Sequence, residues 1–368
     1  MIIKDKISQW FEHFHAHPEV SWKEVETTAT LAKILTEMGV KHHTFDDVTG
    51  VVAEIGEGER VIAVRADIDA LWQEVSGVYQ ANHSCGHDAN MAMVLGALSY
   101  LQEEQLGCRI RFIFQPAEEK GNGANSMIER GAVDGVSQLF GVHLRPQEEI
   151  PFGKVSPAIH HGAAVFLEGK ITGVDAHGAR PHQGNNALDP LFAIAQFVKN
   201  IQFSPFEAYS AKITNIQAGG DSLNIIPGTA TFAIDARSQS NAVLNELKER
   251  IAEGIQAIGK LYAVDIELVW SDYTPAAEVS EEATAIAKQA ILETVGEEGY
   301  APAIITSGSD DFHFYTIHRP ELDAAMIGIG ADLGPGLHHP EMTFNREALD
   351  IGARVLTATL KKASYLEE

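Results

Sequence analysis

The sequence predicts a two-domain α/β protein, in which a largely parallel sheet with helices on both faces is interrupted by a smaller inserted domain. The chain has 368 residues and 45% of them are hydrophobic, which is enough for roughly two domains. Apolar strands alternate with helices over residues 1–162 and again over 273–368, as in parallel sheets. Over residues 163–272 the order becomes βαββαβ, the split βαβ pattern of a ferredoxin-like unit.

The first domain begins with two amphipathic helices. Ile7, Phe11 and Phe14 recur at helical spacing, and "TTATLAKILTEMG" forms a second helix that ends at Gly39. We assign His42 and His43 to a surface loop. The next segments alternate between strand and helix: "GVVAEIG" and "RVIAVRADID" as strands, a helix from about Asp88 to Glu104, the strand "CRIRFIFQ", a short helix around "ANSMIERG" and the strand "SQLFGVH".

The inserted domain has two helices and four strands. Pro190 suits the first turn of one helix and Ser240 caps the other. The six segments are, in order, "AAVFLEGKITG", "LDPLFAIAQFVKNIQ", "AYSAKITNIQAG", "NIIPGTATFAIDAR", "NAVLNELKERIAEGIQAIGKLY" and "VDIELVW". The first domain then resumes with a helix, the strand "AAMIGIG" and a closing helix in "NREALDIGARVLTATLKKASYL".

Composition narrows the class of protein. Fifty-one acidic residues against twenty-seven basic ones give a net charge of −24, which repels nucleic acid and anionic membranes. No apolar run is long enough to span a bilayer and the start of the chain lacks the apolar stretch of a signal peptide, so we expect a cytoplasmic protein. In that reducing compartment Cys85 and Cys108 are expected to stay unpaired, and Cys108 reads as an apolar core residue.

Potential metal ligands follow the ends of several predicted strands. Because ligands bind beyond the carboxyl ends of parallel strands, we expect these side chains to meet at one edge of the sheet. They are Glu118, Glu119, His143, His338 and His339, and we expect Cys85 and His87 to join them there. Sulfur and imidazole ligands favour zinc, cobalt, nickel or manganese over magnesium or calcium. Taken singly, each histidine could equally be structural, and the two glutamates could be a solvated acidic loop.

The adjacent glutamates also suggest a mechanism. Two neighbouring carboxylates at a buried strand end resist ionisation unless cations offset their repulsion. One of them can bind metal while the other acts as general base toward an activated water molecule. Asp67 and Asp69, at the end of "RADID", are expected to orient ligands rather than bind metal, and His15 is expected to be structural.

Several motifs together resemble a known family. In chain order they are "HSCGHDA", "FQPAEEKGNGA", "GVHLRP", "DAHGARPHQGNNALDP", "NIIPGTATFAIDAR", "SGSDDF" and "LHHPEMTFNREAL". The set resembles the metal-dependent amidohydrolases of the aminoacylase and carboxypeptidase G family, in the branch of hippurate hydrolase and the auxin-conjugate hydrolases. This resemblance implies a two-metal site in the α/β domain and an inserted lid domain that also mediates dimerisation.

The resemblance further implies a role for individual residues. Cys85 would bridge two divalent ions (Zn, Mn, Co or Ni) as a thiolate, and the remaining ligands would be His87, Glu119, His143 and His338. Glu118 would be the general base, and His177 would steady the oxyanion from the lid. Asn224 and Arg237 would hold the substrate's carboxylate end. His339 falls outside the ligand pattern.

We therefore expect a homodimeric hydrolase that cleaves the amide bond of an N-acyl amino acid or a similar small conjugate. One alternative is a dipeptidase or carboxypeptidase that uses the same site, and another is a metal-binding paralogue without catalysis. Trp72, Asn90, Arg180 and Asp310 depart from residues common in relatives, which leaves the acyl group and the amino acid undetermined.

Overall fold

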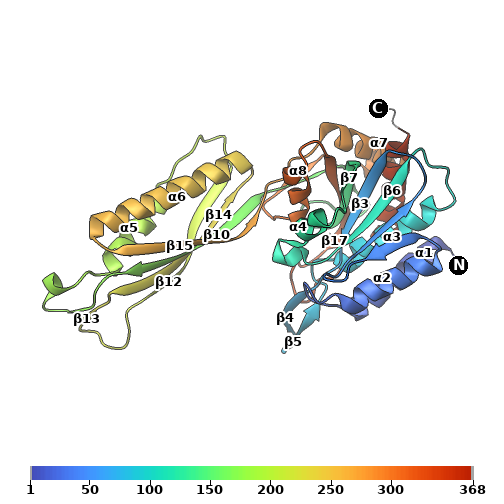
Figure 1. Ribbon diagram of the computed structural model, residues 1–368. Helices are drawn as coiled ribbons and strands as arrows, with labels where there is room; N and C mark the ends of the chain where they lie inside the picture. Colours follow the sequence, from blue (N-terminus) through green and yellow to red (C-terminus); the bar gives the residue numbers. More distant parts are fainter. Residues whose placement is uncertain (1, 366–368) are drawn as a thin grey trace. The chain divides into compact units, whose positions relative to one another are not determined.

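The structure is a computed structural model that describes residues 2–365, and these divide into two compact units (Figure 1). Unit 1 contains the chain up to residue 160, residues 278–305 and the chain from residue 310 onward. Unit 2 contains residues 161–277 together with the short segment 306–309.

Unit 1 is built on a seven-stranded sheet in the order β1-β2-β6-β3-β7-β17-β8. Its four central strands run parallel and its edge strands are antiparallel, which confirms the predicted mostly parallel sheet. The strands are β1 (Lys41–Thr44), β2 (Val51–Ile55), β3 (Val61–Asp67), β6 (Arg109–Gln115), β7 (Val136–Pro146), β8 (Val155–Ser156) and β17 (Asp323–Leu333).

Helices cover both faces of this sheet. One face carries a large apolar core, to which β3 contributes Ile62 and Val64, under four helices: α1 (Ile3–Ala16), α3 (His87–Leu101), α7 (Glu281–Gly299) and α9 (Ala348–Ser364). On the other face of β3, Arg65 lies under the ring of Phe312, in the short turn η3 (Asp311–His313) that leads into α8 (Phe314–His318). The helix α4 (Gly123–Glu129) packs beside α8, and α2 (Val25–Glu37) packs on β1 and β2.

Unit 2 has a four-stranded antiparallel sheet in the order β12-β14-β10-β15, with its own apolar core. Its elements follow the order predicted from the sequence: β10 (Ala163–Thr172), α5 (Leu188–Lys199), β12 (Tyr209–Ala218), β14 (Thr229–Ser238), α6 (Asn241–Tyr262) and β15 (Asp265–Thr274). A small second sheet pairs β11 (Ala176–His177) with β13 (Ile225–Ile226). Asp235 and Arg237 alternate with the buried residues of β14, so they lie on the face of the sheet away from that core.

Three local features differ from the sequence prediction. His42 and His43 lie in the edge strand β1, so their assignment to a loop was wrong; a polar "KHHT" gave no apolar alternation to identify a strand. A hairpin of β4 (Leu71–Val75) and β5 (Val78–Asn82) was not predicted. In addition, α3 ends at Leu101, three residues before the predicted Glu104. Among the described residues no helix combines the length and apolar character needed to cross a membrane.

Candidate metal centre

The sequence-predicted metal ligands of unit 1 come together where the parallel strands end. Asp67 of β3 lies opposite Gln115 of β6, so these two strands end at the same level of the sheet. His143 lies near the end of the neighbouring β7. Cys85 and His87 flank Gly86, whose φ of +85° lies in the left-handed region that favours glycine. This turn starts α3 and brings both side chains to the same edge.

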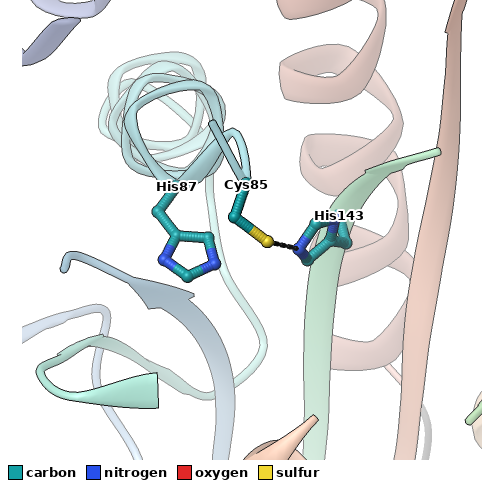
Figure 2. A group of neighbouring side chains, drawn as sticks. All are labelled: Cys85, His87 and His143. Carbon is teal, nitrogen blue, oxygen red and sulfur yellow. Dashed lines mark hydrogen bonds between the residues drawn. The ribbon is translucent and has the colours of Figure 1, made fainter. Parts of the chain in front are cut away.

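Among the five groups of potential ligand atoms in the described residues, two share Cys85. Within each group the nitrogen, sulfur or carboxylate oxygen atoms all lie within 4.8 Å of one another. The first group is Cys85, His87 and His143, and the second is Cys85, Glu119 and His338. Figure 2 shows the Cys85 thiol lying between the two imidazoles of the first group, with Sγ 3.7 Å from His143 Nε2. Two overlapping groups with one common sulfur are the arrangement expected if a thiolate bridges two ions.

Backbone carbonyls fix the orientation of two imidazoles. His87 Nδ1 donates to the Asp69 carbonyl oxygen at 2.9 Å, and His143 Nδ1 donates to the Leu144 carbonyl oxygen at 2.7 Å. Each ring therefore turns Nε2 toward the cluster, as histidine ligands with an orienting partner do. His87 Nε2 and Glu119 Oε1 are buried without a hydrogen-bond partner. Buried polar atoms are rarely left unsatisfied, so these two atoms fit a cation that binds to them.

The two glutamates are placed by Asp69. The carboxylate of Asp69 accepts hydrogen bonds from the backbone N–H groups of Glu118 and Glu119, both at 3.1 Å, and from Ser21 Oγ at 2.6 Å. Asp69 thus orients the glutamates and joins none of the groups of potential ligand atoms, in agreement with the role expected for it, whereas Asp67 forms a further such group with His143 and Asp310. Glu118 Oε2 and Glu119 Oε1 lie 3.8 and 3.9 Å from His87 Nε2, and Glu119 Oε1 lies 3.5 Å from His338 Nε2.

The electrostatics of the cluster are those of an anionic site. Burial, and then the negative charges of Asp310 and Glu119, raise the pKa of Glu118 well above its ordinary range. Burial raises the pKa of Glu119 to about 7, and burial followed by the charge of Glu119 raises the pKa of the Cys85 thiol. Burial lowers the pKa of His143 to about 4, which keeps this imidazole neutral. Divalent cations would stabilise the ionised forms of the glutamates and the thiol and would bind the neutral imidazole, so the donor set fits two such ions.

A buried charge network beneath the cluster was not predicted from the sequence. The fully buried guanidinium of Arg65 donates to Asp67, to Asp311 and to the side-chain oxygen of Gln115. Asn90 Nδ2 donates to the other oxygen of Asp67 at 2.8 Å. The available signal was an arginine in the middle of an otherwise apolar strand, "VIAVRAD", because a buried cation of this kind requires anionic partners.

The remaining site residues lie in unit 2, at two separate places. His177 lies opposite Ile225 in the β11–β13 pair, and the N–H of Gly178 donates to the carbonyl of Asn224, so His177 and Asn224 are neighbours. Both are exposed. Arg237 lies at the far end of β14, where its side chain binds the carboxylate of Asp235 and the Ser307 carbonyl. From Thr229 to Arg237 the strand advances eight residues, or about 26 Å at ~3.3 Å per residue.

Two histidines outside the ligand groups have other partners. His15 Nδ1 lies 2.7 Å from Asp88 Oδ2 in the first turn of α3, and its ring stacks on Phe11, in agreement with the expected structural role. His339 accepts a hydrogen bond from the Glu341 N–H and belongs to neither group that contains Cys85.

Relatives of known name share most of the chain. It is 32% identical to an N-acetyl-L-cysteine deacetylase of Bacillus subtilis, over 92% of this chain and 83% of the relative. It is 30% identical to an IAA-amino acid hydrolase of Arabidopsis thaliana, over 92% of this chain and 81% of the relative.

Two solved structures and a family profile also match most of the chain. A Bacillus subtilis protein described as a dinuclear metal-binding peptidase of the M20 family matches with a TM-score of 0.81 and 26% identity, over 98% of both chains. A putative aminohydrolase of methicillin-resistant Staphylococcus aureus matches with a TM-score of 0.89 and 27% identity, over 98% of this chain and 97% of the other. The sequence profile of peptidase family M20/M25/M40 matches residues 63–362. With this profile spanning most of its length, the chain belongs to peptidase family M20/M25/M40.

Proposed function

We propose that this protein hydrolyses the amide bond of an N-acyl amino acid or a similar small conjugate at a two-metal site in unit 1. The observation that carries the proposal is the pair of ligand groups sharing Cys85, in which His87 Nε2 and Glu119 Oε1 are buried without protein partners. The relatives named as a deacetylase and an amino acid hydrolase act on bonds of this kind, which supports the same reaction class here.

The proposed ligands are Cys85, His87, Glu119, His143 and His338. Two divalent ions held by this set would polarise the substrate carbonyl and acidify a water molecule. Zinc, manganese, cobalt and nickel all suit a set of one thiolate, imidazoles and a carboxylate. Both cysteines, Cys85 and Cys108, are unpaired, as is usual in a reducing compartment, which supports a cytoplasmic location as part of the proposal.

Glu118 is the proposed general base. It takes a proton from the attacking water molecule and passes it to the leaving nitrogen. Its side chain is only 11% exposed, and its Oε1 accepts the Asp311 N–H at 3.4 Å, so the carboxylate is held in a fixed place. Glu119, whose Oε1 approaches both His87 and His338, is the better ligand of the two.

We propose that unit 2 is a ferredoxin-like lid that recognises the substrate's carboxylate. Arg237 lines a pocket of about 470 Å³ together with Lys212, Ser210 and Ser307. A guanidinium in such a pocket can bind a carboxylate through two parallel hydrogen bonds. Asp235 holds Arg237 through its Nε and Nη2 atoms, which fixes the direction of the guanidinium.

His177 and Asn224 are proposed to act on the site of a second subunit. They lie beside β13, which precedes the Thr229 end of β14, whereas Arg237 lies about 26 Å further along that strand, so one small substrate is not expected to contact all three within one copy of unit 2. A dimer supplies the missing residues. The edge strand β12 offers an unpaired side of the sheet for it, with Ile216 and the flanking Phe206 and Leu223 exposed.

The proposed function is tested by measuring released amine from a matched substrate set. Protein reconstituted separately with zinc, manganese, cobalt or nickel is given N-acetyl, N-benzoyl and N-succinyl amino acids and dipeptides, with Glu118→Gln as the inactive control. We expect hydrolysis of at least one N-acyl amino acid, lost when a chelator removes the metal. Hydrolysis of dipeptides alone would favour the peptidase alternative. The absence of amine from every substrate, with metal bound, would favour the non-catalytic alternative.

A further inference from the structure

The loop that carries His338 has an uncommon backbone conformation at that residue. His338 has a φ of +65°, in the left-handed region that few non-glycine residues adopt, although histidine does so more often than most. Such a conformation persists where surrounding contacts determine it. The origin of those contacts therefore decides where the His338 side chain lies.

Hydrogen bonds fix both peptide groups of His338. Its N–H donates to the Ser84 carbonyl at 2.8 Å, and its own carbonyl accepts from Gln73 Nε2 at 3.1 Å. Asn82 Nδ2 donates to Gln73 Oε1 at 2.9 Å and to the Pro340 carbonyl at 3.0 Å. We call Gln73 and Asn82 the amide clamp. It joins the β4–β5 hairpin to the loop on both sides of His338.

The two amides of the clamp lie on the same face of the hairpin. Leu71 lies opposite Asn82, and Gln73 is two residues further along β4, so the side chains of Gln73 and Asn82 are diagonal neighbours. That face is partly buried, whereas the alternate residues Trp72 and Glu74 are exposed. The hairpin thus turns one face toward the His338 loop.

His338 depends on its backbone more than the other imidazoles do. The rings of His87 and His143 are buried and each donates Nδ1–H to a carbonyl oxygen. The His338 side chain is 55% exposed, and its ring has no hydrogen bond to the described residues apart from the 3.5 Å approach of Nε2 to Glu119. The position of the His338 imidazole is therefore determined mainly by the backbone of its loop.

We propose that Gln73 and Asn82 are positioning residues that hold His338 where it can share a metal ion with Cys85 and Glu119. This inference rests on the proposed two-metal site. Only the group Cys85, Glu119 and His338 uses the clamped loop, while the group Cys85, His87 and His143 does not. Loss of the clamp therefore weakens one of the two ions and leaves the other in place.

The test compares metal binding by variants that lack one or the other side-chain amide of the clamp. Gln73→Met keeps the length of the side chain, and Asn82→Ala removes the second amide. Gln80→Met is the matched control, because Gln80 is exposed and lies directly opposite Gln73 in the same hairpin. Metal-free protein is titrated with Co²⁺, and stoichiometry, the dissociation constant of each ion and thiolate-to-cobalt absorption are recorded together with Tm.

We expect wild type and Gln80→Met each to bind two Co²⁺ ions, and the dissociation constant of each ion to be the same in the two proteins. Gln73→Met and Asn82→Ala should bind one ion as before, with the thiolate absorption of Cys85 retained, and the second about 10- to 100-fold more weakly, as when an orienting partner of a ligand is lost. The retained first ion shows that the variants are folded. A purely structural hairpin would instead lower Tm and leave both affinities unchanged.

Two outcomes would overturn the inference, and they are distinguishable. If wild type binds two ions and both clamp variants also bind two with unchanged affinity, the clamp alone is wrong. If wild type itself fails to bind two ions, the proposed metal site is wrong and the clamp with it.

Discussion

Replacement of the buried Arg65 by methionine should destabilise the protein strongly. Arg65 is fully buried, and its guanidinium donates to Asp67 Oδ2 at 2.5 Å, to Asp311 Oδ1 at 2.8 Å and to Gln115 Oε1 at 2.9 Å. Methionine fills much of the same space but supplies neither charge nor donors. Arg65→Met therefore leaves three buried carboxylates, those of Asp67, Asp310 and Asp311, without their cation.

The size of the effect follows from what those carboxylates retain. Asp67 keeps the hydrogen bond from Asn90, and Asp311 keeps those from Gln115 and the Ala124 N–H. Breaking a buried ion pair from one side costs ~3–5 kcal/mol, and the retained donors place this case near the lower end, about 3 kcal/mol. For a domain of this size that corresponds to a Tm lowered by roughly 6–12 °C.

The loss of stability caused by Arg65→Met should also depend on pH. Burial raises the pKa of Asp311 to about 7, although Arg65 acts to lower it, so the pKa rises further without Arg65. The folded state then keeps a proton that the unfolded state has released, and stability falls as pH rises from about 4 through the folded pKa. Arg65→Met should accordingly cost more at about pH 8 than at about pH 5.5.

The assay is thermal unfolding of metal-free protein, followed by calorimetry at both pH values. Arg319→Met is the matched control, because Arg319 pairs with Asp134 at 3.1 Å on the surface of the same unit, where an ion pair contributes about 0–1 kcal/mol. An Arg65→Met shift no larger than that of Arg319→Met, or the same at both pH values, would refute the reasoning.

Three further predictions concern the proposed site. Glu118→Gln should keep both metal ions yet lose at least ~10²-fold in turnover, whereas Glu119→Gln should lose metal as well as turnover. Metal analysis and steady-state kinetics of both variants test this, and the reverse pattern would show that the roles of the two glutamates are exchanged. Arg237→Met should raise KM for a substrate with a free carboxylate by about 10- to 100-fold, the loss of a charged hydrogen bond, but leave KM for the corresponding carboxamide unchanged; equal effects on both would exclude carboxylate binding. Co-refolding inactive Glu118→Gln with inactive His177→Ala should restore activity if His177 serves the partner's site, whereas mixed dimers that stay inactive would rule this out.

The sequence allowed the central sheet and the ligand cluster to be predicted because both follow from local patterns. Apolar runs such as "RIRFIFQ" identify buried parallel strands, and polar residues just after such runs fall at one edge of the sheet. Glu119 and His338 are 219 residues apart along the chain (338 − 119), yet each follows a strand predicted to end at this edge. Cys85 does not directly follow a predicted strand. The assignment of each residue to a role needed the family resemblance as well.

The Arg65 network could not be predicted because its partners are determined only by the packing. Arg65 and Asp311 are 246 residues apart, and Asp311 reaches Arg65 because Phe312 lies over the sheet at that point. The sequence predicts that a buried arginine needs an anion but does not say which of fifty-one acidic residues supplies it.

The β4–β5 hairpin could have been predicted from its turn. Ser76 and Gly77 both have positive φ, as a two-residue hairpin turn of type I′ requires, and a Ser-Gly pair is a known turn signal. The flanking strands are short and largely exposed, so their apolar alternation was too weak to identify them. The separation of Asn224 from Arg237 along the sheet likewise could not be predicted, because it depends on the register of β14 in the folded sheet.

The proposal depends most on Cys85, whose thiolate would be a ligand shared by two divalent ions. The most direct measurement is the metal content per chain of wild type and Cys85→Ala, purified without chelator and reconstituted with Co²⁺, together with the thiolate-to-cobalt absorption. We expect two ions and a strong thiolate band in wild type. In Cys85→Ala we expect no such band and a clear loss of bound metal, since both groups that contain this sulfur lose a ligand. Two tightly bound ions in both proteins, or fewer than two in reconstituted wild type, would overturn this proposal.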